Sequence, residues 1–264
     1  MLQIKDVFKT FNAGTINEKV ALKGVNLHLK PGDFVTVIGG NGAGKSTMLN
    51  SVAGVFPVDE GQILIDGEDV THLPEYKRAK FIGRVFQDPM MGTAATMQIE
   101  ENLALAARRG KFRGLVPGIT KAEREMYREE LKILGLGLED RMTAKVGLLS
   151  GGQRQALTLL MATLQKPKLL LLDEHTAALD PKTAAKVLDV TQRIVERDNL
   201  TTLMITHNMR DAIAYGNRLI MMYDGVVLLD VSGEEKKNLT VEQLLNLFSK
   251  ASGSNEANDK MLLS

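Results

Sequence analysis

The spacing of apolar and polar residues predicts strands and helices in alternation over most of the chain. Continuous apolar runs, typical of strands buried on both faces, occur at residues 33–40, 169–173 and 201–206. A helical pattern follows each of them, over residues 45–54, 182–197 and 209–215. Because a strand followed by a helix and another strand is the repeating unit of α/β proteins, this order predicts an α/β fold with a mostly parallel sheet.

Shorter apolar stretches predict the remaining strands. Residues Leu2–Phe8 and Val25–Leu29 flank a polar connection and are expected to form an antiparallel β edge. Two more short strands are predicted, over residues 61–67 and 79–88. A hairpin is predicted over 218–231, because Asp224 and Gly225 tolerate the positive φ angles that a two-residue turn requires.

The middle of the chain has a different character. The run "KAEREMYREELKIL", residues 121–134, is rich in charged helix formers, and β-branched residues rarely cluster around it. A last helix is expected over 241–249, before a polar end that we expect to be frayed. The predicted division is an α/β core, an inserted helical subdomain and a flexible tail, at residues 1–88 with 167–249, 89–166 and 250–264, respectively.

Composition narrows the range of partners. The chain has 264 residues with 33 Lys and Arg against 32 Asp and Glu, so no excess of positive charge favours nucleic acid as a partner. The absence of cysteine excludes disulfides, thiol catalysis and zinc–thiolate sites. The N-terminal "MLQIKDVFKT" lacks the pattern of a signal peptide, and no apolar run reaches the roughly 20 residues of a membrane helix. Any role at a membrane is therefore expected to depend on a partner.

The segment "GGNGAGKS" predicts a phosphate-binding loop. It fits the pattern G-x-x-x-x-G-K-[ST] at every fixed position and lies between a predicted strand and a predicted helix. Glycines let consecutive backbone N–H groups face one anion, and the helix N-terminus adds partial positive charge. Lys45 is expected to reach the β- and γ-phosphates of a nucleotide, and Ser46 to bind Mg²⁺. The residues expected to contact the nucleotide here are Gly39, Gly40, Asn41, Gly42, Ala43, Gly44, Lys45, Ser46 and Thr47.

Two acids end the apolar strand in "LLLLDEHTAALD", residues 169–180. Ligands of open α/β sheets bind at the carboxyl ends of the strands, so these acids are expected to face the same nucleotide. Asp173 is placed to bind the Mg²⁺, and Glu174 to accept a proton from the attacking water as general base. Without the phosphate-binding loop, the pair would more simply mark the solvated end of a strand.

The segment "LSGGQRQAL", residues 149–157, predicts a second anion-binding helix start. Ser150 is expected to cap the helix, while Gly151 and Gly152 leave its backbone accessible. One nucleotide needs only one such loop. The second one therefore requires an explanation.

Together these motifs resemble those of the ATP-binding subunits of ABC transporters. The resemblance runs from the N-terminus to about residue 249 and agrees in order as well as wording: "GGNGAGKST", Gln87 after "GRVF", "LSGGQRQ", "LLLLDE", "AALD" and His207 in "MITHN". In this family two subunits pair head to tail, so that each ATP lies between the phosphate-binding loop of one and the LSGGQ helix of the other. The resemblance thus implies that the nucleotide of the partner subunit is bound by Ser150, Gly151, Gly152 and Gln153.

The resemblance also implies roles for single residues, with ATP and Mg²⁺ as cofactors. Gln87 would sense the Mg²⁺ and the attacking water, His207 would bond the γ-phosphate, and Asp180 would contact the opposite subunit. Phe11 is expected to stack on adenine in preference to the nearby Phe8. The metal-binding residues implied in this way are Ser46, Gln87 and Asp173.

The sequence departs from the usual family wording after Glu174, where His175 stands in place of a proline. A histidine restores a backbone N–H and adds a group that titrates near neutrality. Two interpretations follow: a mark of a subgroup without a catalytic part, which we favour, or a group that modulates protonation of Glu174.

The wording "LSGGQRQALTLLMATL" with "DEHTAALDP" is similar to subunits that work with a separate permease and a lipoprotein solute receptor, some of them serving amino acids. The implied partners are a transmembrane permease, a second ATP-binding subunit in a homodimer and, indirectly, the lipoprotein. The implied location is peripheral, on the cytoplasmic face of the membrane. The permease contact is expected at the groove beside Gln87, along the Met-rich "QDPMMGTAATM".

Two other function classes remain to be weighed. A soluble ATPase of the same family that remodels a non-membrane partner, as in iron–sulfur cluster assembly, is the alternative to transport. A P-loop kinase that phosphorylates a small molecule would not explain "LSGGQ".

Overall fold

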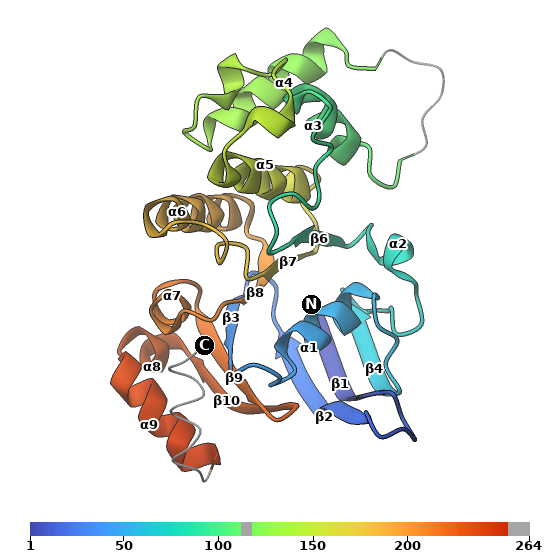
Figure 1. Cartoon of the computed structure of the whole chain (residues 1–264), viewed down its shortest axis with the longest axis vertical. Helices are drawn as coiled ribbons and strands as arrows, with labels where there is room; N and C mark the ends of the chain where they lie inside the picture. The colour runs from blue at the N-terminus through green and yellow to red at the C-terminus, as the bar shows by residue number, and fades with distance from the viewer. Residues whose placement is uncertain (112–117, 253–264) are drawn as a thin grey trace.

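The computed structural model of the chain describes residues 1–111 and 118–252, which form two sheets with helices packed around them (Figure 1). The larger sheet has the order β10-β9-β3-β8-β7-β6. Its strands are β3 (Phe34–Ile38), β6 (Ile82–Val85), β7 (Leu169–Asp173), β8 (Thr201–Ile205), β9 (Arg218–Tyr223) and β10 (Val226–Ser232). Neighbours from β9 to β6 pair in parallel, and only β10 is antiparallel to its neighbour. The predicted α/β class with a mostly parallel sheet is confirmed.

The four leucines of β7 show why its sequence has no polar side. Leu169 and Leu171 are fully buried in a core that they share with helix α1 (Lys45–Ala53) and the smaller sheet. Leu170 and Leu172 are fully buried in a second core, with the helices on the other side. Successive side chains of a strand point to opposite faces, so a strand covered on both faces must be apolar throughout.

The smaller sheet is antiparallel and has the order β2-β1-β4-β5. Its strands are β1 (Leu2–Phe11), β2 (Lys19–Leu29), β4 (Glu60–Ile65) and β5 (Glu68–Asp69). The two N-terminal strands are thus antiparallel partners, as expected, but they belong to a sheet of their own. Their alternating apolar residues pack toward α1, which joins both sheets in one core.

Both strands of the N-terminal hairpin are longer than the sequence pattern predicts. β1 continues to Phe11 and β2 begins at Lys19, and these two residues pair across the hairpin. Asp59 holds this extension, because its carboxylate accepts hydrogen bonds from Lys9 Nζ at 2.8 Å and from the Thr10 backbone N–H at 2.5 Å. A long-range ion pair therefore extends the strand through polar residues that alone predict a loop.

The predicted helical segment contains α3 (Ile99–Ala107), α4 (Lys121–Lys132) and α5 (Gly151–Thr163), with short 3-10 turns at Leu138–Asp140 and Val146–Leu148. These helices form the upper part of the molecule in Figure 1, above α6 (Pro181–Asp198). α4 begins at a reciprocal cap: Thr120 Oγ1 accepts from the Glu123 N–H, and the Glu123 carboxylate accepts from the Thr120 N–H. The apolar faces of these helices share one core with α6 and β7.

The C-terminal part continues the main sheet and then covers it. α7 (Met209–Ala214) precedes the β9–β10 hairpin, whose turn has positive φ angles at Asp224 (45°) and Gly225 (82°), as the predicted turn requires. The short helices α2 (Glu75–Arg78) and α8 (Gly233–Lys237) do not stand out in the sequence pattern. α9 (Val241–Ser252) extends beyond the predicted end at Ser249, so residues 250–252 of the expected tail are helical and 253–264 lie outside the described residues.

None of the helices within residues 1–111 and 118–252 is long and apolar enough to cross a membrane.

Candidate active site

Four parallel strands bring the predicted site residues to one edge of the sheet. The loop from Gly39 follows β3, Gln87 lies just beyond β6, Asp173 ends β7 and His207 lies just beyond β8. The order β3-β8-β7-β6 makes these strands neighbours. Their carboxyl ends therefore meet where α/β sheets bind ligands.

Glycine is required at two positions of the loop between β3 and α1. Gly39 has φ 149°, and a Cβ there would lie 2.3 Å from the Met222 carbonyl oxygen. Gly44 has φ 99°, and a Cβ there would lie 2.7 Å from the Ala21 carbonyl oxygen. Gly44 also caps α1 without a side-chain hydrogen bond. The N-terminal turn of α1 thus has no capping side chain from its own N-cap, which suits it to an anionic ligand.

Lys45 is buried, with 7% of its surface exposed. Its Nζ donates to the carbonyl oxygens of Gly39, at 2.6 Å, and Gly40, at 3.2 Å. Burial lowers the pKa of Lys45, and the nearby charges of Glu174 and Asp173 oppose this shift. The cation is held at the loop by neutral acceptors, and a phosphate would provide a much stronger partner.

A pocket of about 190 Å³ lies over this loop. Its lining residues come from the loop, the start of α1, the N-terminal hairpin and the end of β7: Phe11, Lys19, Ala21, Asn41, Gly42, Ala43, Gly44, Lys45, Ser46, Thr47 and Glu174. Phe11 lines the pocket and meets the ring of Phe56 edge-on at 5.2 Å between centroids. The alternative, Phe8, is not part of this lining and packs over Gly24.

Arg84 also lies in this region, although no sequence motif assigns it a role. Its Nη2 lies 3.7 Å from Asp173 Oδ2 and donates to Asn50 Oδ1 at 2.6 Å. Burial raises the pKa of Asp173, Glu174 adds to the shift, and Arg84 and Lys45 oppose it. The signal available in the sequence was the charge itself, since an arginine inside the short strand "IGRV" needs an acidic partner.

Glu174 has an unusual backbone conformation. Its φ is 46°, in the left-handed region that is unfavourable for a residue with a Cβ. The Glu174 N–H donates to the Ile205 carbonyl oxygen at 3.1 Å. Its Oε2 lies 3.6 Å from His207 Nδ1, so the two side chains named from separate motifs face one another.

The residues named for Mg²⁺ supply oxygen donors only. Ser46 has a hydroxyl, Asp173 a carboxylate and Gln87 an amide oxygen, which suits Mg²⁺ and does not suit a thiophilic metal. Within the part of the chain that the structure describes, no group of three His, Cys, Asp or Glu residues forms a self-contained metal site. This is the donor set expected when nucleotide phosphates complete the coordination sphere.

The second glycine-rich helix start lies elsewhere. Ser150 caps α5: its Oγ accepts from the Gln153 N–H at 3.3 Å, and Gln153 Oε1 accepts from the Ser150 N–H at 3.1 Å. Ser150, Gly152 and Gln153 line a pocket of about 530 Å³ between α5 and α6, which shares no lining residue with the pocket at Lys45. Within one chain, the two helix starts do not face a common cavity.

Gly152 is required for packing as well. A Cβ at this position would lie 2.0 Å from Thr183 Cγ2 on α6. The glycine pair in the sequence predicts an accessible backbone, but Gly152 is buried against α6. Asp180 is the N-cap of the same helix, and its carboxylate accepts from the Thr183 N–H at 3.1 Å. Hydrogen bonds from the side chain and the backbone N–H of Thr183 lower the pKa of Asp180, which stays exposed at the start of α6.

His175 points into the protein. It is 1% exposed, and its Nε2 lies 3.1 Å from Thr191 Oγ1 on α6. Burial lowers the pKa of His175 to about 4, so the ring is neutral at physiological pH. A neutral, buried ring brings no charge that titrates beside Glu174 near neutrality.

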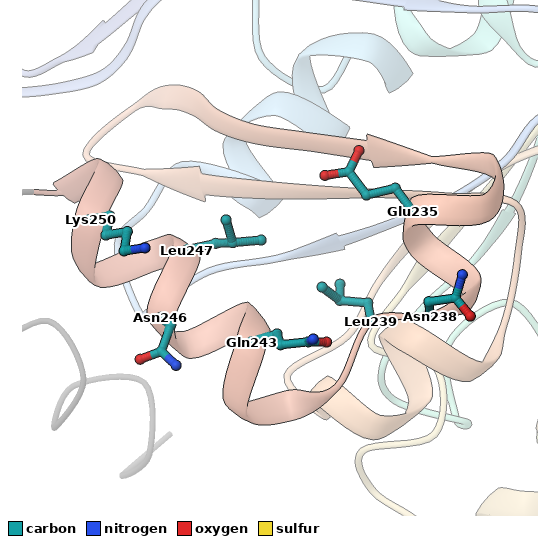
Figure 2. Close-up of a pocket in the computed structure, with 7 residues that line it drawn as sticks. All are labelled: Glu235, Asn238, Leu239, Gln243, Asn246, Leu247 and Lys250. Atoms are coloured by element: carbon teal, nitrogen blue, oxygen red, sulfur yellow. The ribbon is translucent and has the colours of Figure 1, made fainter.

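A groove of about 470 Å³, larger than the pocket at Lys45, lies between α8 and α9 (Figure 2). Two of its amide side chains are engaged by their own helices: Asn238 Nδ2 donates to the Glu234 carbonyl oxygen, and Gln243 Oε1 accepts from the Thr240 N–H. None of the predicted site residues lines it. The volume of a pocket therefore does not identify the active site here. The chemistry of the residues that line the pocket identifies it.

The chain is similar to several known proteins along most of its length. The family model described as ABC transporter matches residues 22–177. A tyrosine transport ATP-binding protein of Clostridioides difficile (strain R20291) is 46% identical, over 94% of this chain and 98% of its own length. An ABC transporter ATP-binding protein of Bacillus subtilis (strain 168) is 33% identical, over 98% of this chain and 96% of its own. A dimeric ATP-binding cassette, solved in a post-hydrolysis state with ADP and phosphate, is similar with a TM-score of 0.74 and 33% identity, over 88% of this chain and 98% of that one.

Proposed function

Since the chain belongs to the ABC transporter family as one of its ATP-hydrolysing subunits, we propose that it binds Mg-ATP between two copies of itself and drives a permease that imports a small solute such as an amino acid. Each ATP would lie between the loop of one copy and the LSGGQ helix of the other. The chain would act at the cytoplasmic face of the membrane, as a peripheral subunit of the permease.

The observation that carries this proposal is the separation of the two helix starts. Lys45 and Ser150 line different pockets, so within one chain the two helix starts do not face a common nucleotide. A head-to-tail pair would bring them together. The similarity to a cassette solved as a dimer with ADP and phosphate supports this arrangement.

Within each site, the phosphates and the metal would be held by groups at the sheet edge. Lys45 would exchange its loop carbonyls for the β- and γ-phosphates. Ser46, Asp173 and Gln87 would hold Mg²⁺, which neutralises charge on the phosphates when it is bound. Phe11 would stack on the adenine, because it lines the pocket beside the loop.

Hydrolysis would depend on Glu174 and His207, which follow β7 and β8. Glu174 would take the proton of the attacking water, which contributes typically about 10²–10⁴-fold. His207, at 3.6 Å from that carboxylate, would orient it and bond the γ-phosphate. Asp180, exposed at the start of α6, would contact the opposite copy.

The permease contact would lie beside Gln87. Met90 and Met91 follow it and are 59% and 51% exposed, which gives an adaptable apolar surface for an inserted helix. A relative named for tyrosine transport supports an amino acid, and an aromatic one, as the solute. Co-purification with a non-membrane partner alone would favour the remodelling alternative instead.

Glu174→Gln tests the proposed chemistry. The amide keeps the shape of the side chain but cannot take a proton, so we expect Mg-ATP binding to remain and turnover to fall by about 10²-fold or more. The measurement is steady-state ATPase activity beside Mg-ATP binding by calorimetry, together with amino-acid uptake in vesicles that contain the permease. Turnover close to wild type would remove Glu174 from the role of general base.

A further inference from the structure

The conformation of Glu174 depends on the residues around it. β7 ends at Asp173, and Glu174 then turns out of the sheet with φ 46°. A left-handed conformation at a residue with a Cβ persists only where its surroundings hold it. Two backbone bonds do so: the Glu174 N–H donates to Ile205, and its carbonyl oxygen accepts from the Ala177 N–H at 2.9 Å.

A third restraint comes from the side chain of the next residue. His175 is 1% exposed and Thr191 is fully buried, and the 3.1 Å contact between them joins the strand end to α6. The Thr191 hydroxyl donates its only hydrogen to the Val187 carbonyl oxygen at 2.8 Å. Its oxygen is therefore the acceptor from His175, which places the ring hydrogen on Nε2.

We propose that His175 is a positioning residue, whose Nε2–H bond to Thr191 anchors the strand end to α6 and so keeps Glu174 in the conformation that aims its carboxylate at the reacting water. The inference rests on the role proposed above for Glu174. Proline, which the family commonly has at this position, cannot donate such a bond. Where a proline ring would restrict the backbone covalently, this chain has a buried hydrogen bond from the His175 side chain to Thr191.

The position of the tether explains why it would affect turnover more than binding. The phosphate-binding loop follows β3 and holds Lys45 through its own carbonyl groups, independently of α6. The direction of the Glu174 carboxylate instead depends on the backbone between β7 and α6. That backbone is held to α6 by the contact between His175 and Thr191. Loss of the tether is therefore expected to change kcat and to leave KM for ATP almost unchanged.

Thr191→Val removes the acceptor and keeps the shape of the side chain. In the full-length protein we expect kcat to fall about fivefold to tenfold, the range for loss of one buried hydrogen bond, with KM for ATP within about twofold. Thr191→Ser keeps the hydroxyl and should retain most of the activity. His175→Leu should reproduce the loss, and His175→Gln, whose amide donor is the same number of bonds from the backbone, should restore part of it.

Thr163→Val is the matched control. Thr163, on α5, is also buried at 1% exposure, and its hydroxyl donates to the Leu159 carbonyl oxygen at 2.9 Å, as Thr191 does to Val187. This variant loses the same kind of helix bond without any link to Glu174. If the tether only stabilised the fold, both valine variants would lower the melting temperature and neither would change kcat per folded, ATP-binding subunit.

The decisive measurement combines Thr191→Val with Glu174→Gln. If His175 acts through Glu174, Thr191→Val lowers the kcat of the wild type but causes no further loss in the Glu174→Gln background. An equal loss in both backgrounds, or the same kcat for Thr191→Val and Thr163→Val, would overturn the tether. Normal turnover of Glu174→Gln itself would instead overturn the proposed role of the base, and with it the purpose of the tether.

Discussion

The starts of α1 and α5 are both rich in glycine, yet they are built in opposite ways. At α1 the cap is Gly44, which has no side chain to offer, and a buried lysine follows it. At α5 the cap is Ser150. Its hydroxyl oxygen accepts from the Gln153 backbone N–H, and the Gln153 side-chain oxygen accepts from the Ser150 backbone N–H. The first helix start is open to a ligand, whereas the second is closed by its own side chains.

Under the proposed function, this difference divides the work between the two helix starts. The loop at Lys45 has glycines with positive φ angles and a cation, and both features suit tight binding of phosphate. The helix at Ser150 needs no ligand to satisfy its cap, so it is suited to approach a nucleotide that another copy already holds. Three variants test this comparison.

Lys45→Ala is expected to have the largest effect. One charge serves both the bound nucleotide and the transition state, so kcat/KM for ATP should fall about 1,000-fold, at the upper end for loss of one preorganised group. Mg-ATP binding by calorimetry and steady-state hydrolysis check this. Binding and turnover that both match the wild type would show that this loop is not the nucleotide site.

Ser150→Arg should reduce turnover about 100-fold while ATP still binds at Lys45 of the same chain, because a bulky cation replaces the cap where the second copy must close. Mixed dimers with Lys45→Ala sharpen the comparison. They hold one site with both lesions and one with neither, so the mixture should hydrolyse ATP faster than either variant alone. Wild-type hydrolysis by Ser150→Arg alone would contradict a role of α5 across the interface.

Gly152→Ala is expected to have the smallest effect, and on stability. A Cβ 2.0 Å from Thr183 Cγ2 forces a shift of α5 against α6, and this outweighs the gain in helix propensity, for a net loss of about 1 kcal/mol. Thermal unfolding measures it. Thr183→Ser removes the clashing methyl group and should restore the loss in the double variant, while Gly40→Ala, which meets nothing within 4 Å, should unfold like the wild type. If Gly152→Ala is as stable as Gly40→Ala, then α6 moves away from the added methyl group without a loss of stability.

The parts of the fold that the sequence predicted well are those whose signal is local and strong. The buried strands β7 and β8 and the helix α6 follow from their apolar runs and periodicity, and the hairpin at Asp224 follows from its turn residues. The adjoining ends of β1 and β2 were missed because an ion pair between Lys9 and Asp59 extends β1, and the end of β1 then pairs with the start of β2. Such a pair joins residues far apart in the chain, and no window of sequence contains both.

The candidate site divides in the same way. The loop at Lys45, the acid pair after β7 and the cap at Ser150 were evident because each needs particular residue types at adjacent positions. The residue types in these motifs were therefore enough to predict the chemistry of the site. Only the tertiary structure placed Arg84 beside Asp173, His175 against Thr191 and Gly152 against Thr183. Those contacts depend on how separate strands and helices pack, because burial and distance, and not residue order, decide which side chains meet.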